Sequence, residues 1–336
     1  MREETNIKKD KNNYTTWEFI FTTFIITYAM GGFIAYGYYT GRDIGFLCTV
    51  QMLYPALTAL MLDQKGNGGC FYRSKLFYAY LVGSLLLVIT AVSETFFHIA
   101  PKNILAIIVL VHFVFLLLLF QPIGKKKEGH IRISVGNFCL YSLFYILLWF
   151  GINLISAFCE ESAKNFLLDA MNMKNWLIFF SQLPAFFYNF LFFFGEEYGW
   201  RFFLQPKLQE RYGRWKGVVI LGFVWGIWHL PLNLFYYSTP ENWKYAISSQ
   251  ILGCIVLAII FAKLYNMMNS LVMIMWMHYI HNLLGTIFYA ENGDSDKGSL
   301  QSVVLAFVSQ LVLIGFILLL EKEKKLRYFA HKRSKK

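Results

Sequence analysis

Charged residues are scarce in this chain of 336 residues: only 15% are Asp, Glu, Lys or Arg, whereas 57% are hydrophobic. About a quarter of the residues of a soluble domain are charged, so we expect most of this chain to lie in lipid. The short alternating segments of a membrane β-barrel are also lacking, because apolar runs such as "LVHFVFLLLLF" are continuous. The sequence therefore predicts an all-α, polytopic bundle of transmembrane helices.

Paired cysteines are lacking as well. The five cysteines are dispersed and no CxxC motif occurs, which argues against a disulfide or cysteine-based metal framework and favours packing roles. The first apolar stretch, about 17–40, is too long for a signal-peptide core, and no small-residue cleavage site follows it. We therefore expect the first helix to be retained as an anchor.

The charged residues, together with Gly and Pro, divide the chain into about ten candidate spans of the length that a bilayer requires. These spans are expected to begin near Trp17, Ile44, Lys75, Lys102, Phe138, Trp176, Lys216, Lys244, Ser270 and Ser299. The formal charge of +11 arises from Lys and Arg between the spans and at the chain ends, which is the positive-inside pattern rather than a sign of nucleic-acid binding. The placement predicts a multi-pass cell-membrane protein with both termini in the cytoplasm.

Three of the late spans contain ionisable or amide side chains, which are costly in a membrane and are therefore functional candidates. They are Glu196, Glu197 and Arg201 in one span, His229 in the next of the three, and His278 and Asn282 in the last. At about 1.5 Å per residue, the helical rise places Glu196, His229, His278 and Asn282 roughly 12–18 Å from the cytoplasmic ends of their spans. Polar groups of three helices should therefore meet in one layer.

Helical spacing distinguishes the two adjacent glutamates. Glu197 and Arg201 are four residues apart and share a helix face, which predicts an ion pair. This pair would either support the catalytic site or only hold helices together. Glu196 points about 100° away and is left unpaired by Arg201. His281 is displaced by one residue from the face shared by His278 and Asn282, so we expect it to face elsewhere.

This set of side chains is suited to hydrolysis of an amide bond by water. A carboxylate in a medium of low dielectric constant is a stronger base than in water, which suits a general base near neutral pH. A histidine can orient the water, and an Asn amide with a second histidine can donate hydrogen bonds to the developing oxyanion. No GxSxG or HExxH motif occurs, so the templates of serine hydrolases and ordinary zinc proteases do not apply.

Three short segments, "EEYGWR", "WGIWHLP" and "HYIHN", resemble in order the EExxxR, FxxxH and HxxxN motifs of the CAAX-protease and bacteriocin-processing (CPBP) intramembrane endopeptidases. The resemblance covers about 176–289, roughly a third of the chain. It implies the following roles: Glu196 and His229 activate water, His278 and Asn282 stabilise the oxyanion, and Glu197 and Arg201 support the site. It also points to a bacterial cell membrane. From the depth of the polar layer, we expect the peptide bond to be cleaved near the cytoplasmic half of the bilayer.

One residue departs from the motifs: Trp225 stands where the family usually has Phe. Because this ring is expected to pack in the cavity wall, the change bears on how a substrate fits more than on the chemistry. The resemblance assigns residues 171–320 to a catalytic core. Residues 1–170 are N-terminal helices of unassigned role, and 321–336 are a basic cytoplasmic tail.

Several alternatives stay open. The family is grouped with metalloproteases, and Glu196, His229 and His278 would in principle form a zinc site with an open water position. Because these ligands lie on three helices without short paired spacing, we favour activation of water without a metal. The substrate is a peptide or a membrane-protein segment, for example a prenylated C-terminus or a leader peptide. A bacteriocin-immunity or regulatory protein without proteolysis, and a transporter that relays protons through Glu and His, are the alternative functions.

Overall fold

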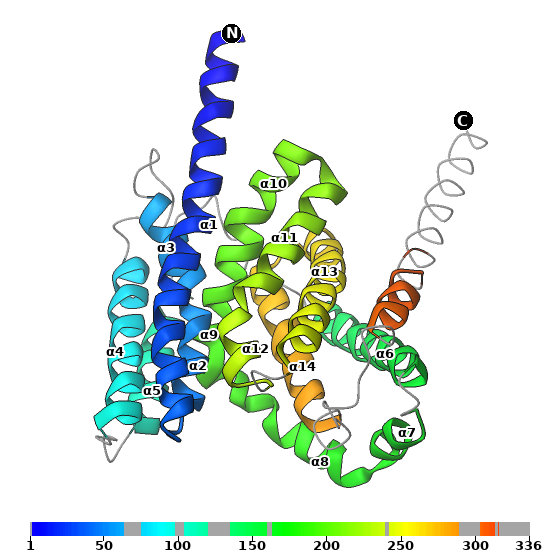
Figure 1. The fold of residues 1–336 in the computed structure, drawn as a ribbon. Helices are drawn as coiled ribbons and strands as arrows, with labels where there is room; N and C mark the ends of the chain where they lie inside the picture. The colour runs from blue at the N-terminus through cyan, green and yellow to red at the C-terminus, as the bar shows by residue number, and fades with distance from the viewer. Residues whose placement is uncertain are drawn as a thin grey trace, which may run out of the picture.

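The computed structural model describes residues 2–63, 75–97, 104–119, 135–159, 163–238, 242–288, 303–312 and 315. Within these ranges the chain is helical apart from short connections, and no strand occurs in them (Figure 1). This confirms the predicted all-α polytopic bundle. The segments that carry Cys70, Lys126 and the basic tail 321–336 lie outside the described residues.

The helices follow the apolar runs of the sequence. The first half contains α1 (Arg2–Tyr39), α2 (Gly45–Thr49), the 3-10 turn η1 (Val50–Leu53), α3 (Tyr54–Asp63), α4 (Lys75–Phe97), α5 (Ile104–Leu119) and α6 (Val135–Cys159). The second half contains α7 (Ala163–Met171), α8 (Met173–Gln182), η3 (Leu183–Ala185), α9 (Phe186–Glu197), η4 (Tyr198–Leu204), α10 (Gln205–Tyr212), α11 (Arg214–Trp228), α12 (Leu230–Phe235), α13 (Trp243–Met268) and α14 (Leu271–Phe288).

Seven helical segments of the described chain are long and apolar enough to cross a membrane, so the prediction of about ten spans is wrong. The expected spans near Lys102, Lys216 and Ser299 correspond to shorter helices: α5 has 16 residues, α11 has 15, and the last described helix is Val303–Val312. The α11 span is short because the chain turns at His229 and restarts in α12 with Pro231 in its first turn. Proline is tolerated at the start of a helix but not in its interior.

Helix α9 lies in the middle of the bundle and packs against α3, α5, α14 and η1. Two glycines, Gly195 in α9 and Gly199 in the following η4 (Tyr198–Leu204), permit close approach to η1 and α3. A Cβ atom at Gly195 would collide with the backbone carbonyl of Met52 in η1, and one at Gly199 would collide with Pro55 in α3. Small residues allow the backbones of membrane helices to approach closely. The N-terminal helices are thereby packed directly behind the segment that carries Glu196 and Glu197.

The two ends of the bundle are distinguished by the helix termini that they contain (Figure 1). The start of α1, helix α10 and the start of α11 lie at the upper end in this view. We call it the basic end because α10 and the first turn of α11 carry Lys207, Arg211, Arg214 and Lys216. The end of α1, the end of α12 and helix α8 lie at the opposite, lower end.

Candidate active site

The two adjacent glutamates lie at the junction between α9 and η4, a π-helical segment that continues α9 without interruption. Glu196 is only 3% exposed, and Glu197 and Arg201 are completely buried. Wide π-turns inside α-helices occur frequently at functional sites. The carboxylates are therefore held in the protein interior rather than towards lipid.

Glu197 joins two cationic or potentially cationic side chains. Its Oε2 atom lies 3.2 Å from Nε of Arg201, which confirms the predicted ion pair, and its Oε1 atom accepts a hydrogen bond of 2.7 Å from Nδ1 of His278. The Arg201 guanidinium also lies against two rings, 4.5 Å from the Trp225 centroid and 5.3 Å from the Phe261 centroid. Such contacts are favourable when they are desolvated. Glu197 thus links η4 to α14.

Glu196 has a different partner. Its Oε2 atom accepts a hydrogen bond of 2.9 Å from the indole Nε1 of Trp225 on α11. The sequence analysis assigned Trp225 only to the cavity wall, and no spacing rule predicts this contact between helices. A hydrogen bond to a charged group is worth more than one between neutral groups, so Trp225 orients the carboxylate. A phenylalanine at this position would have no N–H to donate.

His229 forms the turn between α11 and α12, and its Nδ1 atom lies 2.8 Å from the carbonyl oxygen of Trp225. Because a carbonyl can only accept, Nδ1 carries the proton, and in the neutral ring Nε2 keeps a lone pair. The carbonyls of Ile227 and Trp228, next to this turn, accept hydrogen bonds from side chains of the N-terminal helices. The hydroxyl of Tyr28 donates to the first at 3.0 Å, and the amide of Gln51 donates to the second at 3.3 Å.

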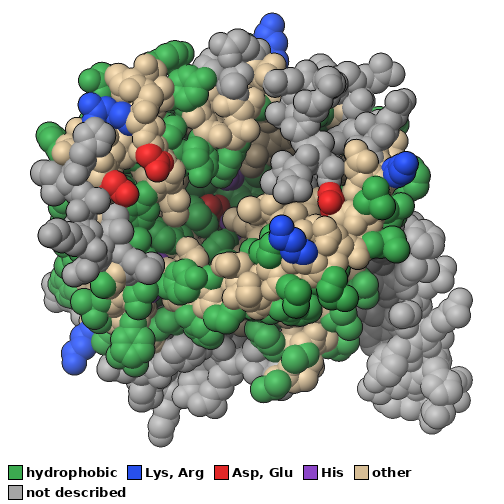
Figure 2. Space-filling view, turned by 90° about the horizontal axis from the view of Figure 1, so that it is seen from below, with side chains coloured by type: hydrophobic (Ala, Val, Ile, Leu, Met, Phe, Trp, Pro, Cys, Tyr) green, Lys and Arg blue, Asp and Glu red, His purple; other side chains and the backbone are tan. Residues whose placement is uncertain are grey.

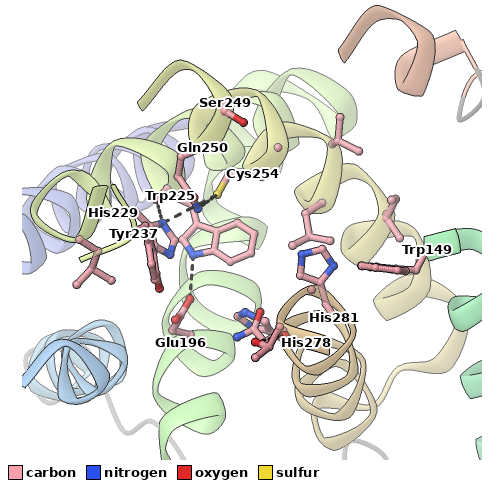
Figure 3. Close-up of a pocket in the computed structure, with 18 of the residues that line it drawn as sticks. Trp149, Glu196, Trp225, His229, Tyr237, Ser249, Gln250, Cys254, His278 and His281 are labelled. Carbon is pink, nitrogen blue, oxygen red and sulfur yellow. Dashed lines mark hydrogen bonds between the residues drawn. The ribbon is translucent and has the colours of Figure 1, made fainter. Parts of the chain in front are cut away.

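These side chains surround a single cavity of about 750 Å³. Among the residues that line it are Glu196, Trp225, His229, His278 and Asn282, so the structure brings the four predicted catalytic residues together. Glu197 and Arg201 lie behind the wall, in contact with His278 and Trp225. Figure 3 shows Glu196 below the Trp225 indole, with His229 to one side and His278 to the other.

The structure places further reactive side chains in the cavity that the sequence analysis did not predict. The expectation that His281 faces elsewhere is wrong: it lines the cavity, and its Nδ1 atom lies 3.1 Å from the hydroxyl of Tyr145 on α6. Cys254 on α13 also lines the cavity as a free thiol, 4.0 Å from Nδ1 of His229. These contacts join residues far apart in the chain, so no local pattern could have revealed them.

The suggested zinc ligands do not meet the requirements of a metal site in this arrangement. Within the described part of the chain, no group of three or more His, Cys, Asp or Glu side chains is placed to hold a metal ion. The Nδ1 atoms of His229 and His278 are bonded to the Trp225 carbonyl and to Glu197, which leaves only their Nε2 atoms as potential metal ligands. A tetrahedral zinc site needs three protein ligands converging on one point. The chemistry proposed below therefore uses only groups of the chain.

A comparison with known families finds one match, to the family described as type II CAAX prenyl endopeptidase Rce1-like, over residues 179–284. This range includes Glu196, His229, His278 and Asn282. No curated protein and no solved structure matches the chain. Residues 179–284, about a third of the chain, are therefore similar to the CAAX prenyl endopeptidases of this family.

Proposed function

We propose that the protein is an intramembrane endopeptidase in which Glu196 and His229 activate water, and His278 and Asn282 stabilise the oxyanion. The observation that carries the proposal is that these four residues, from α9, the α11–α12 turn and α14, line one cavity. The family match supports the reaction class. The residue roles rest on the geometry and on the motif resemblance.

The first half of the reaction needs a base and a group that orients the water. Glu196 uses Oε2 to accept from Trp225, which leaves Oε1 for the water. His229 has its Nδ1 proton directed to a backbone carbonyl, so Nε2 can accept a second hydrogen bond from the same water. The water transfers one proton to Glu196 while its oxygen forms a bond to the carbonyl carbon of the substrate.

The oxyanion requires hydrogen-bond donors directed at it. Because Nδ1 of His278 donates to Glu197, Nε2 can donate only when the ring carries both protons. Two carboxylates, Glu196 and Glu197, then balance Arg201 and a protonated His278, so the buried site has no net charge. Asn282 supplies an amide N–H as the second donor. When the C–N bond breaks, the proton held by Glu196 passes to the leaving amine.

The proposal is tested by comparing membrane peptides from cells that carry the wild type, Glu196→Gln or the control Glu210→Gln. Glu210 lies on the exposed surface of α10, away from the cavity. Fragments produced by the wild type should persist with the control and disappear with Glu196→Gln, because general-base catalysis is worth ~10²–10⁴-fold in rate. An unchanged fragment set with well-expressed Glu196→Gln would refute the proposal.

A further inference from the structure

The cavity opens towards one end of the bundle. Its lining residues on α14 extend from His278 to Thr286, in the half of the helix that ends at the lower end in Figure 1. Those of α2 and η1 extend from Cys48 to Met52, next to the same end. Figure 2, which views the molecule from below, shows a hollow with acidic and histidine side chains at its floor. The mouth is therefore at the lower end.

The opposite side of the cavity floor is closed by packed side chains. Glu197, Arg201 and Trp200 are completely buried, and Trp200 packs edge-on against Trp228 with ring centroids 5.5 Å apart. Arg201 in turn is covered by the Trp225 and Phe261 rings. Within the described residues, a substrate thus reaches Glu196 from the lower end and not through the basic end.

The charges of the described connections identify the side of the membrane on which each end lies. Helix α10 and the first turn of α11, at the basic end, carry four Lys or Arg residues, which are Lys207, Arg211, Arg214 and Lys216. At the lower end, single lysines lie on α7, α8 and the first turn of α13, which are Lys164, Lys174 and Lys244. Arg42 at this end is followed directly by Asp43, and its guanidinium donates to the carbonyls of Thr95 and Phe96 at the end of α4. Connections rich in Lys and Arg stay in the cytoplasm, so the basic end faces the cytoplasm.

The wall between the mouth and Glu196 determines what kind of segment can enter. It presents aromatic rings, including Tyr145, Trp149 and Tyr237, and the amide side chains of Asn153 and Gln250. Neither Lys, Arg nor Asp is among the described residues that line the cavity. Glu196, at the floor, is the only carboxylate among the described lining residues. A charged side chain held along the wall away from Glu196 would therefore be desolvated without a counter-charge, which is costly, whereas amides can pair with the backbone of an extended peptide.

We propose that the cavity opens on the extracytoplasmic side and receives an extended, uncharged segment of an exported polypeptide. The description of the occupant as a substrate rests on the proposed endopeptidase function, but the side of entry does not. The inference replaces the expectation that the bond is cleaved from the cytoplasmic half of the bilayer. The positions of the polar residues within their spans predict the depth of the polar layer. The side from which a substrate reaches this layer depends instead on which side of it is closed by packed side chains.

The side of entry is tested by labelling single cysteines with a charged, membrane-impermeant maleimide, in a background without the five native cysteines. Thr286→Cys, in the mouth, should be labelled on intact cells. The control Arg211→Cys, exposed on α10, should be labelled only after permeabilisation. Ser249→Cys, also exposed and lining the mouth, guards against a folding defect at one position. Labelling of Arg211→Cys in intact cells, or protection of both mouth cysteines, would overturn the inference.

The kind of occupant is tested by protection against the same reagent. A capped peptide of Ala, Leu and Ser, added outside, should slow labelling of Thr286→Cys severalfold, and the same peptide with two central lysines should not. Equal protection by both peptides would contradict an uncharged occupant. Because labelling needs no catalysis, Glu196→Gln should give the same pattern. Normal labelling without any cleavage would leave the entry side intact and refute only the endopeptidase function.

Discussion

Glu197→Gln is expected to impair stability and catalysis through two separate contacts. The carboxylate is completely buried and contacts both Arg201 and His278. Removing its charge leaves the Arg201 guanidinium without its counter-charge, and breaking a buried ion pair costs ~3–5 kcal/mol. At about 2–4 °C per kcal/mol for a domain of moderate size, the melting temperature in detergent should fall by roughly 10 °C.

A second substitution separates the two effects. In Glu197→Gln with Arg201→Met, the methionine replaces the cation between Trp225 and Phe261 with an apolar chain, so much of the stability should return. Activity should not return, because a neutral glutamine does not stabilise the doubly protonated His278. Loss of one oxyanion donor costs about 10²–10³-fold in kcat. The assays are melting temperature and cleavage rate measured below the transition of each variant.

Two results would refute this reasoning. A single Glu197→Gln variant with wild-type melting temperature would show that the pair with Arg201 contributes little. Recovery of both stability and activity in the double variant would show that Glu197 acts only through Arg201 and that its contact with His278 is unimportant.

Three further predictions address the wall, the packing and the metal. Trp225→Phe removes the hydrogen-bond donor to Glu196. Because hydrogen bonds to charged groups contribute ~1.5–3 kcal/mol, the cleavage rate should fall at least about tenfold while the fold is retained. An unchanged cleavage rate would contradict the role of Trp225 in orienting the carboxylate. Gly195→Ala should destabilise the protein by ~1–3 kcal/mol because its Cβ atom meets the Met52 carbonyl, whereas Gly151→Ala, with open space around it, should not; equal melting temperatures would contradict the close packing. Protein purified with stringent chelation should keep its cleavage rate and contain much less than one equivalent of zinc, and restoration of a lost activity by added zinc would overturn the metal-free mechanism.

Much of the fold class and of the candidate site could be predicted from the sequence because these features depend on local geometry. Continuous apolar runs require helices in lipid, where each backbone group must be bonded within its own segment. The ion pair between Glu197 and Arg201 follows from a spacing of four residues on one helix. The three motifs can also be recognised in the sequence, and they identify four residues that line the cavity, Glu196, His229, His278 and Asn282.

The number of spans could not be predicted in the same way. Hydropathy identifies an apolar run but does not show where the helix within it ends. The sequence therefore predicts full membrane spans at α11 and α5, which are shorter helices in the structure. The turn at His229 is supported by tertiary contacts, since Tyr28 and Gln51 donate hydrogen bonds to the carbonyls of Ile227 and Trp228 next to it. Helices outside the matched range thus contact the turn that carries His229, the residue to which we assign the orientation of the water.

Contacts between helices were decided by the tertiary structure alone. The bonds from Trp225 to Glu196 and from His278 to Glu197 join residues 29 and 81 positions apart, and each depends on the rotation and tilt of two helices. The periodicity of one helix shows which side chains share its face but not what that face meets. The direction in which the cavity opens has the same origin, because packing by Trp200, Arg201 and their neighbours closes one side of a polar layer whose depth the sequence alone had indicated.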